Sequence, residues 1–210
     1  MFKYVLFDWD GCLVDTLPIW YQGMKRGLSD FGITASDMEI KMGFQTWDFF
    51  IEMGVPDLNL FTGIVYEYVM SRLERVRFND GVIELLEYAK GRDIKTAIVT
   101  STERSSLSPV LSSLDAGAYF DCIITRRDVK KLKPDPGPIF MAVDKLGGRR
   151  EETIMVGDSL SDIQAGKNAG VKTVLYEPES NREYHLNRTD VSDISPDMII
   201  THMDELKNLI

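Results

Sequence analysis

Acidic residues follow two of the short hydrophobic runs in this chain. Asp8 and Asp10 come after the first run, and Asp158 and Asp162 come after a later one. Carboxylates that crowd into one place repel one another, so a cation must lie among them. Oxygen ligands of this kind favour Mg²⁺ over Zn²⁺. The pattern therefore predicts a magnesium site, provided that the fold brings the two acidic pairs together.

Two further hydrophobic runs lead to groups that bind phosphoryl oxygens. One run ends in Thr100 and Ser101, and the other is followed by a basic stretch that contains Lys133. A lysine and a hydroxyl opposite a bound Mg²⁺ would bind the oxygens of a phosphoryl group. Such a site suits phosphoryl transfer, in which positioning and neutralisation of charge do most of the catalysis.

The hydrophobic runs are predicted to be strands of one sheet. Runs such as AIVT and TIMVG lack alternating polar residues, which is typical of parallel strands that are covered on both faces. Helical patterns at about 81–91, 103–114, 136–146 and 160–169 separate most of them. This alternation favours an α/β fold with a Rossmann-like, doubly wound parallel sheet. The expected strands are 4–9, 95–100, 122–125, 153–157, 173–176 and 198–201.

The segment between the first two expected strands is far longer than a crossover requires. Apolar side chains recur at helical spacing from Leu17 to Phe31, and a second series runs from Phe61 to Val69. Glycines and a proline divide the segment into roughly four helices. We therefore expect a helical cap domain over 16–79, inserted after the first strand. The remaining residues, 1–15 and 80–210, would form the Rossmann-like core domain.

The composition argues against several classes of protein. The chain has 24 basic and 33 acidic residues, so a formal charge of -9 gives it no evident affinity for nucleic acid or an anionic membrane. No apolar run approaches the ~18 residues of a membrane span, and the first residues lack the apolar core of a signal peptide. Cys12 and Cys122 do not have the spacing of a disulfide framework or a zinc site. We expect a cytoplasmic protein with free thiols, monomeric or homodimeric, whose partner is a small phosphorylated metabolite.

Four motifs, in order, resemble those of the haloacid dehalogenase-like hydrolases. They are DWDGCLVDT at 8–16, AIVTS at 97–101, KPDP at 133–136 and VGDSLSD at 156–162. Each is weak alone, but all four fall at the ends of expected strands, and together they are highly specific. The resemblance covers essentially the whole chain. It points to the phosphatase branch with a helical (C1-type) cap, which includes proteins similar to phosphoglycolate phosphatase and beta-phosphoglucomutase.

The resemblance implies hydrolysis of a small phosphate monoester through an aspartyl-phosphate. Asp8 would be the nucleophile that attacks phosphorus. Asp10 would protonate the leaving alcohol and then activate the hydrolytic water. Mg²⁺ would be held by the carboxylates of Asp8 and Asp158 and by the main-chain carbonyl of Asp10. Asp162, one helical turn after Asp158, would orient a metal-bound water or Lys133.

The resemblance also implies which residues bind the transferred group. Thr100 and Lys133 would contact phosphoryl oxygens and so belong to the catalytic set. Ser101 would contribute to the same phosphate site, together with the nucleophile Asp8. Gly11 would let the backbone turn closely past the phosphate.

Substrate choice is expected to depend on the cap, which would exclude water during transfer. Aromatic residues at helical spacing also pack the interior of a helical domain, so a purely structural role stays open for the candidates. Trp9, Arg126 and Arg127 are likewise open between substrate contact and a structural or solvated position. The candidate specificity residues are Trp20, Lys41, Phe44, Gln45 and Trp47.

Other members of this family, and unrelated proteins that have similar motifs, fit the sequence less well. Dehalogenating relatives lack the equivalent of Asp10, because they have no oxygen leaving group to protonate. Sugar-phosphate mutases such as beta-phosphoglucomutase use a cap histidine and a cap arginine, but 17–20 contains no His and 41–46 no Arg. A mutase and a non-catalytic protein that binds a phosphorylated ligand remain the alternatives. A serine esterase lacks its D-x-x-H motif here, and a receiver domain does not accommodate the helical insert.

Overall fold

The sheet of this protein is parallel throughout and has six strands in the described part of the chain. The structure, a computed structural model, describes residues 1–186 and 195–210. The strand order is β3-β2-β1-β4-β5-β6, so the first strand lies in the middle. This order confirms the expected α/β fold with a Rossmann-like sheet. The strands are β1 (Tyr4–Phe7), β2 (Lys95–Val99), β3 (Cys122–Ile124), β4 (Thr153–Gly157), β5 (Lys172–Tyr176) and β6 (Met198–Ile200).

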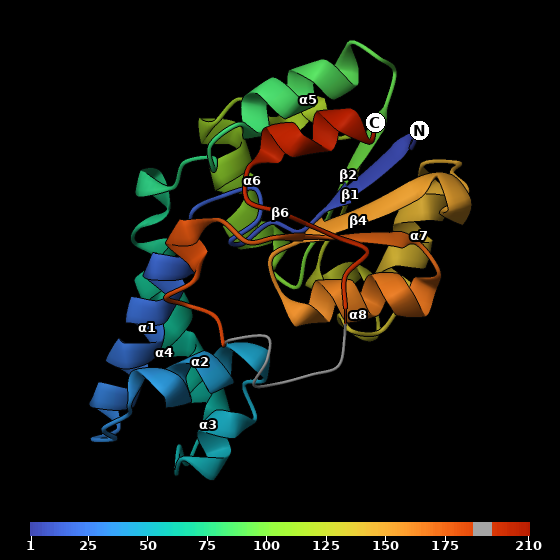
Figure 1. Cartoon of the computed structure of the whole chain (residues 1–210). Helices are drawn as coiled ribbons and strands as arrows, with labels where there is room; N and C mark the ends of the chain where they lie inside the picture. Colours follow the sequence, from blue (N-terminus) through green and yellow to red (C-terminus); the bar gives the residue numbers. More distant parts are fainter. Residues whose placement is uncertain (187–194) are drawn as a thin grey trace. The chain divides into compact units, whose positions relative to one another are not determined.

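Helices cover both faces of this sheet, as the uniformly apolar strands require. Figure 1 shows α5 and the C-terminal 3-10 helix η7 on one face, and α7 and α8 on the other. Leu6 of β1 pairs in register with Ala97 of β2 and Met155 of β4, and all three face α7 and α8 in one buried cluster. The helices of this unit are α5 (Val82–Lys90), α6 (Arg104–Ser113), α7 (Gly137–Lys145), α8 (Leu160–Ala169) and η7 (Met203–Asn208).

Four α-helices lie between residues 16 and 76, in the long stretch that separates β1 from β2. In the first of them the buried residues include Leu17, Trp20, Met24 and Leu28, which is the stripe that the sequence periodicity predicted. Phe61, Val65 and Val69 form the buried stripe of the fourth. The two stripes pack against each other. The helices are α1 (Leu17–Asp30), α2 (Asp37–Gln45), α3 (Phe49–Glu52) and α4 (Leu58–Met70), followed by the 3-10 helix η1 (Leu73–Arg75).

The chain divides into two compact units. The sheet unit contains Met1–Asp15, Arg77–Glu179 and the described residues of the C-terminal segment, 195–210. The helical unit contains Thr16–Val76 together with the described residues 180–186, which follow β5. Within the helical unit the ring of Tyr184 contacts the ring of Tyr21, with centroids 5.5 Å apart. Residues 180–186 therefore belong to the helical unit, whereas a cap of 16–79 would leave them in the core domain. We propose that these two units are the functional domains.

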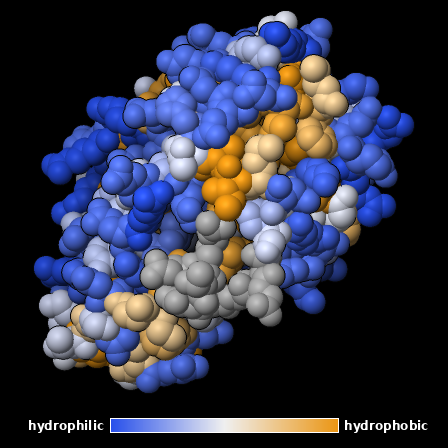
Figure 2. Space-filling view, viewed as in Figure 1, coloured by the Kyte–Doolittle hydropathy of each residue, from blue (hydrophilic) through white to orange (hydrophobic). Residues whose placement is uncertain are grey.

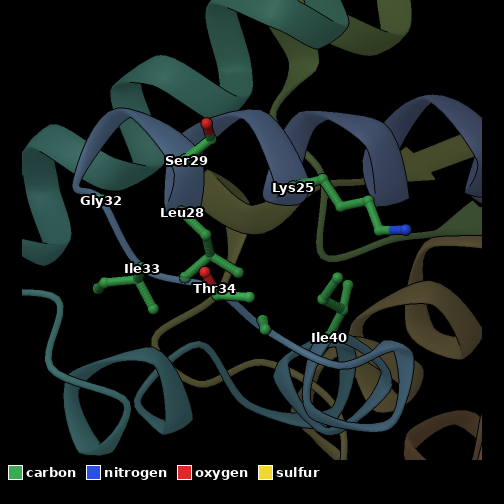
Figure 3. A pocket seen from close by; sticks show the side chains of 8 residues that line it. Lys25, Leu28, Ser29, Gly32, Ile33, Thr34 and Ile40 are labelled. Atoms are coloured by element: carbon green, nitrogen blue, oxygen red, sulfur yellow. The ribbon is translucent and has the colours of Figure 1, made fainter.

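The face shown in Figure 2 is mostly hydrophilic, in keeping with the acidic composition. A cavity of about 380 Å³ opens in the helical unit, where Lys25, Leu28 and Ile40 are among the residues that line it (Figure 3). Its one cationic group, the Lys25 amine, already pairs with Asp37 at 3.1 Å. Among the described residues, no helix is long and apolar enough to cross a membrane.

Strand β6 at the edge of the sheet is attached to β5 through Asp197. One oxygen of its carboxylate accepts hydrogen bonds from the backbone N–H and the hydroxyl of Thr173, at 3.0 and 2.7 Å. The ammonium groups of Lys167 and Lys172 lie 3.1 and 3.2 Å from the same carboxylate. Burial raises the pKa of Asp197, but the hydrogen bonds from Thr173 and the two lysines outweigh it, so the pKa lies below its ordinary value.

The substitution Asp197→Asn should lower the free energy of unfolding by about 1 kcal/mol at neutral pH, because two cations and two donors lose a charged acceptor. A carboxyl with a depressed pKa stabilises the fold above its unfolded pKa of about 4 and loses that contribution as pH falls further. The difference in the free energy of unfolding between wild type and Asp197→Asn should therefore become smaller between pH 4 and pH 3. Urea unfolding at pH 7, 5, 4 and 3 measures it, with the exposed Asp144→Asn as control. A deficit that stays constant over this range would contradict the assignment.

Candidate functional site

The site begins at the carboxyl end of β1. The backbone N–H of Asp8 donates to the carbonyl of Val156 on β4 at 2.9 Å, so the strand pairing continues one residue beyond Phe7. β2 lies on the other side of β1, and the segment after each strand opens at the same edge of the sheet. This is the edge to which the sequence assigned the four motifs.

Lys133 connects three of these segments through its buried ammonium group. Its Nζ donates to Asp8 Oδ1 at 2.7 Å, to Asp162 Oδ1 at 2.6 Å and to the carbonyl of Val99 at 2.8 Å. The Lys133 side chain is only 3% exposed. Burial alone would lower the pKa of Lys133, but the carboxylates of Asp162 and Asp8 raise it above its ordinary value. The lysine is therefore a fixed positive charge with all three donors in use.

Asp162 is completely buried, and both of its carboxylate oxygens are engaged. Oδ1 accepts from Lys133, and Oδ2 accepts from the backbone N–H and the hydroxyl of Ser159, at 3.1 and 2.6 Å. The Ser159 contacts form a capping box that begins α8. Asp162 thus fixes the position of Lys133 relative to the start of α8. Because both of its carboxylate oxygens already accept hydrogen bonds from the protein, Asp162 is poorly suited to bind a metal directly.

Gly157 makes room for this arrangement at the end of β4. A Cβ atom built on Gly157 would lie 2.3 Å from Cγ of Asp162, which is closer than real contacts allow. The residue before Asp158 must therefore be glycine for the α8 carboxylate to pack against the strand. The sequence analysis gave Gly157 no role, although the GDS segment contained the signal.

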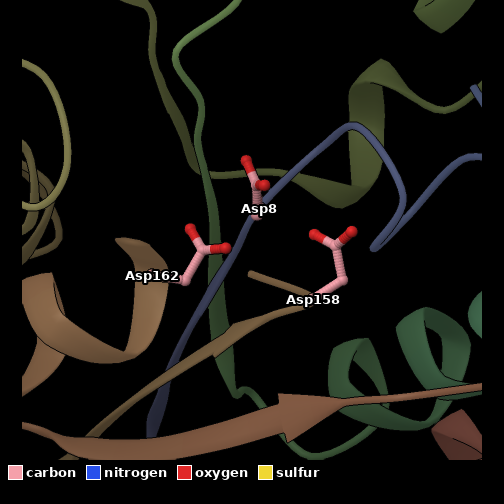
Figure 4. A group of neighbouring side chains, drawn as sticks. All are labelled: Asp8, Asp158 and Asp162. Atoms are coloured by element: carbon pink, nitrogen blue, oxygen red, sulfur yellow. The ribbon is translucent and has the colours of Figure 1, made fainter. Parts of the chain in front are cut away.

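Three carboxylates gather at this edge, and the ammonium group of Lys133 binds two of them, Asp8 and Asp162. Oxygens of Asp8, Asp158 and Asp162 all lie within 4.8 Å of one another, and Figure 4 shows the three side chains converging. Burial raises the pKa of Asp8 well above its ordinary value, and the charges of Asp162 and Asp158 raise it further against the opposing effect of Lys133. Carboxylates this close to one another repel, and a bound cation would stabilise the cluster.

The donor set fits Mg²⁺. Asp8 and Asp158 carry carboxylate oxygens that could bind a metal, whereas both oxygens of Asp162 are bound by Lys133 and Ser159. Oxygen ligands with room for water suit Mg²⁺ better than a soft ion. The buried thiol of Cys12 donates to the carbonyl of Val156 at 3.6 Å, and burial raises its pKa, so it remains protonated. Both cysteines are free, as the sequence indicated.

Asp10 belongs to a second hydrogen-bonded group that also includes Thr100. The hydroxyl of Thr102 donates to Asp10 Oδ2 at 2.6 Å, and the backbone N–H of Thr102 donates to the hydroxyl oxygen of Thr100 at 3.0 Å. Ser101 lies between these two threonines and is half-buried. Sequence reasoning missed Thr102, because the motif that ends β2 was taken to finish at Ser101.

The turn after Asp10 depends on Gly11 and on a distant asparagine. Gly11 has φ of 76°, a left-handed conformation that glycine adopts without strain, as the sequence suggested. The side-chain amide of Asn79 donates to the carbonyls of Gly11 and Cys12 at 3.2 and 2.8 Å. Nothing in the local sequence of Asn79 marks this role, since the two segments meet only in the fold.

The candidate specificity residues lie in the helical unit. Trp20 is buried, and its ring packs edge-on against Trp47 with centroids 6.3 Å apart. Phe44 stacks on Tyr21, and Lys41 is half-buried on the same helix, α2. Gln45 ends α2, and its side chain lies outside what the structure describes. Trp20 and Trp47 thus help to form the interior of this unit, and a role in substrate choice stays a prediction for all five.

The structure also places the three residues whose role the sequence left open. Trp9 is 2% exposed and packs edge-on against Phe78, so it is part of the core of the sheet unit. Arg127 is highly exposed and pairs with Glu103 at 3.2 Å. Arg126 is exposed on η3 (Arg126–Asp128), and its backbone N–H donates to the carbonyl of Thr102.

Comparison with known proteins agrees with this geometry. The family model described as haloacid dehalogenase-like hydrolase matches residues 5–176. The pyrophosphatase PpaX of Bacillus velezensis is 33% identical over 181 residues, which is 80% of either chain. The phosphoglycolate phosphatase of Pseudomonas syringae pv. tomato is 28% identical over 227 residues, 99% of this chain and 78% of the relative. The crystal structure of CbbY from Rhodobacter sphaeroides in complex with phosphate has a TM-score of 0.80 at 19% identity, and covers 98% of this chain and 96% of CbbY.

The chain therefore belongs to the haloacid dehalogenase-like hydrolases, and within them to the phosphatases. The match to a family model over most of the chain confirms the family that the four motifs predicted. Phosphorylated compounds are the substrates of this class.

The substitution Gly157→Ala should impair the site more than its small size suggests. The new methyl group would displace Asp162, which cannot move without breaking contacts to Lys133 and Ser159. We expect a loss of about 1–3 kcal/mol in the free energy of unfolding and a fall in phosphatase turnover of up to about 100-fold. Denaturant unfolding and steady-state assays measure the two effects. The control is Gly117→Ala, where a methyl group would contact nothing within 4 Å; equal effects in the two variants would contradict the steric argument.

Replacement of Lys133 by methionine should destabilise the fold strongly. The carboxylates of Asp8 and Asp162 would remain buried without their shared cation, which costs about 3–5 kcal/mol for a broken buried ion pair. The expected result at pH 7 is a large drop in the free energy of unfolding, measured with urea in EDTA. Lys130→Met, at an exposed lysine three residues earlier, should have almost no effect. A loss below about 1 kcal/mol for Lys133→Met would show that the buried cation is dispensable.

Proposed function

We propose that this protein is a magnesium-dependent phosphatase that hydrolyses a small phosphate monoester through an aspartyl-phosphate at Asp8. One observation carries the proposal: the Asp8 carboxylate is held by Lys133 at 2.7 Å on one side, and an oxygen of Asp158 lies within 4.8 Å of it. A nucleophile that must approach an anionic phosphate needs positive charge beside it. The same surroundings supply one cation directly and a donor set for a second.

The first step transfers the phosphoryl group to Asp8. An oxygen of the Asp8 carboxylate forms a bond to phosphorus while the bond from phosphorus to the leaving oxygen breaks. The carboxyl group of Asp10 gives its proton to that leaving oxygen, so the substrate departs as a neutral alcohol. The three N–H donors of Lys133 are bound by Asp8, Asp162 and Val99, so Lys133 stabilises the transferred group by its charge and not by the direct contact that the sequence predicted. The hydroxyl of Thr100 can donate to the transferred group because its oxygen already accepts from Thr102.

The second step releases inorganic phosphate. The Asp10 carboxylate takes a proton from a water molecule, and the water oxygen attacks the phosphorus of the aspartyl-phosphate. The bond between phosphorus and the Asp8 oxygen breaks, which regenerates both carboxyl groups in their starting states. Lys133 and Asp162 hold Asp8 in the same position through both steps.

Mg²⁺ is the expected cofactor. The carboxylates of Asp8 and Asp158 and the main-chain carbonyl of Asp10 would hold it, and Asp162 would act through Lys133. When bound, the ion supplies positive charge that neutralises the phosphate and the excess carboxylates.

The substrate class has two main candidates. The relative from Pseudomonas syringae is a phosphoglycolate phosphatase, which favours a small phosphate monoester. The relative from Bacillus velezensis is a pyrophosphatase, and at 33% identity it makes pyrophosphate the second candidate. The chemistry at Asp8 is the same for both, since each offers a phosphoryl group on an oxygen leaving group. We propose that the helical unit decides between them, with Trp20, Lys41, Phe44, Gln45 and Trp47 as the residues to vary.

A panel of phosphoglycolate, sugar phosphates, nucleoside monophosphates and pyrophosphate, assayed with Mg²⁺ and with EDTA, tests the proposal. Wild type should release phosphate only with Mg²⁺, and Asp8→Asn should lose turnover by more than about 1000-fold, because the amide cannot act as the nucleophile. The chosen ester, labelled with ³²P and quenched in acid, should leave a hydroxylamine-sensitive label on the peptide that contains Asp8.

The alternatives predict different results in the same assays. Conversion of one sugar phosphate isomer into another, without net release of phosphate, would indicate a mutase. Binding of phosphorylated ligands without turnover would indicate a non-catalytic protein. Turnover that persists in EDTA, or in Asp8→Asn, would overturn the mechanism.

A further inference from the structure

Thr102 is fixed in place by its main chain, independently of its hydroxyl. It is 8% exposed and lies between β2 and α6. Its backbone N–H donates to the hydroxyl oxygen of Thr100 at 3.0 Å, and its carbonyl accepts from the backbone N–H of Arg126 at 3.2 Å. The segment is thus attached on both sides without any help from the Thr102 side chain.

The hydroxyl of Thr102 is directed at the acid–base residue of the proposed mechanism. It donates to Asp10 Oδ2 at 2.6 Å, a short bond that joins the segment after β1 to the segment after β2. A buried hydroxyl keeps such a bond only if the acceptor is held in a matching orientation. Since the main chain needs no support from this hydroxyl, the bond serves to orient Asp10.

We propose that Thr102 is a positioning residue that orients the Asp10 carboxyl group for the acid–base step. This inference rests on the proposed function, since it concerns the acid–base step of that reaction. The hydrogen bond from the Thr102 hydroxyl to Oδ2 fixes the rotation of the Asp10 carboxyl group. In the proposed reaction the carboxyl group, held in this orientation, gives a proton to the leaving oxygen in the first step and takes one from water in the second. The same residue orients Thr100 through its backbone N–H, which couples the acid–base group to a phosphate-binding hydroxyl.

A leaving-group series separates this role from a purely structural one. p-Nitrophenolate leaves without protonation, whereas the phenolate of phenyl phosphate and the alkoxide of an alkyl phosphate need the proton from Asp10. The experiment measures kcat/KM with p-nitrophenyl, phenyl, p-methoxyphenyl and alkyl phosphates in the presence of Mg²⁺. Asp10→Asn serves as the reference for complete loss of the acid.

For Thr102→Val we expect a loss of about 10- to 100-fold on phenyl, p-methoxyphenyl and alkyl phosphates, because the acid is misplaced. The loss on p-nitrophenyl phosphate should stay within about threefold, since that substrate does not use the acid. Thr102→Ser keeps the hydroxyl, so its kcat/KM should depend on the leaving group as it does in wild type. Thr102→Ala is a second variant with the same expectation as valine, should the larger side chain disturb folding.

The matched control is Thr153→Val on β4. Its buried hydroxyl also donates to a single acceptor, the carbonyl of Arg149 at 2.8 Å, at the opposite end of the strand from Asp158. This variant should leave the dependence on the leaving group unchanged even if it lowers stability.

The outcomes distinguish the two levels of the proposal. An equal loss on all esters in Thr102→Val and Thr102→Ala, in an enzyme whose wild type hydrolyses them, overturns the role of Thr102 and leaves the proposed function intact. The proposal is also overturned if kcat/KM depends on the leaving group as steeply in Thr102→Ser as in Thr102→Val. If wild type hydrolyses no ester while the protein is folded, the proposed function fails first, and the inference about Thr102 fails with it.

Discussion

The ammonium group of Lys133 is the interaction on which the site of this hydrolase depends. It binds the carboxylates of Asp8 and Asp162 and the carbonyl of Val99, so it joins the ends of β1 and β2 to the first turn of α8. Burying the ammonium group alone would cost free energy, and so would burying the two carboxylates alone. Each offsets the cost of burying the other, because the opposite charges are in contact. Asp158 adds a third carboxylate within 4.8 Å of the other two, and such a cluster favours the binding of a further cation.

The parts of the structure that follow from local sequence could be predicted. The strands end where the apolar runs end, because a parallel sheet covered on both faces admits few polar side chains. α1 and α4 follow the helical spacing of their buried residues, and Asp8, Lys133 and Asp162 meet as their motifs indicated. Trp9 between two acidic residues was ambiguous in sequence, and packing against Phe78 resolves it as a core residue.

The remaining features depend on contacts between distant segments, which no local pattern reports. Asn79 binds the turn at Gly11, and Thr102 binds Asp10, across 68 and 92 residues of chain. Gly157 is needed for a side chain five positions later, which becomes visible only when the strand and the helix are packed together. Residues 180–186 follow the fifth strand in sequence but pack with the helical unit, through a ring contact between Tyr184 and Tyr21 that periodicity could not indicate.

The central place of β1 in the sheet has a consequence for how the protein is made. β1 precedes both of its partners in the chain, since β2 and β4 start at Lys95 and Thr153. The edge of β1 that pairs with β2 has no partner until Val99 has been made, and the edge that pairs with β4 has none until Gly157. At ordinary rates of synthesis the second interval is on the order of ten seconds. The helical unit up to Val76 is complete well before then and can fold first. Asp8 is thus made before Lys133, Asp158 and Asp162, which lie around it in the folded site.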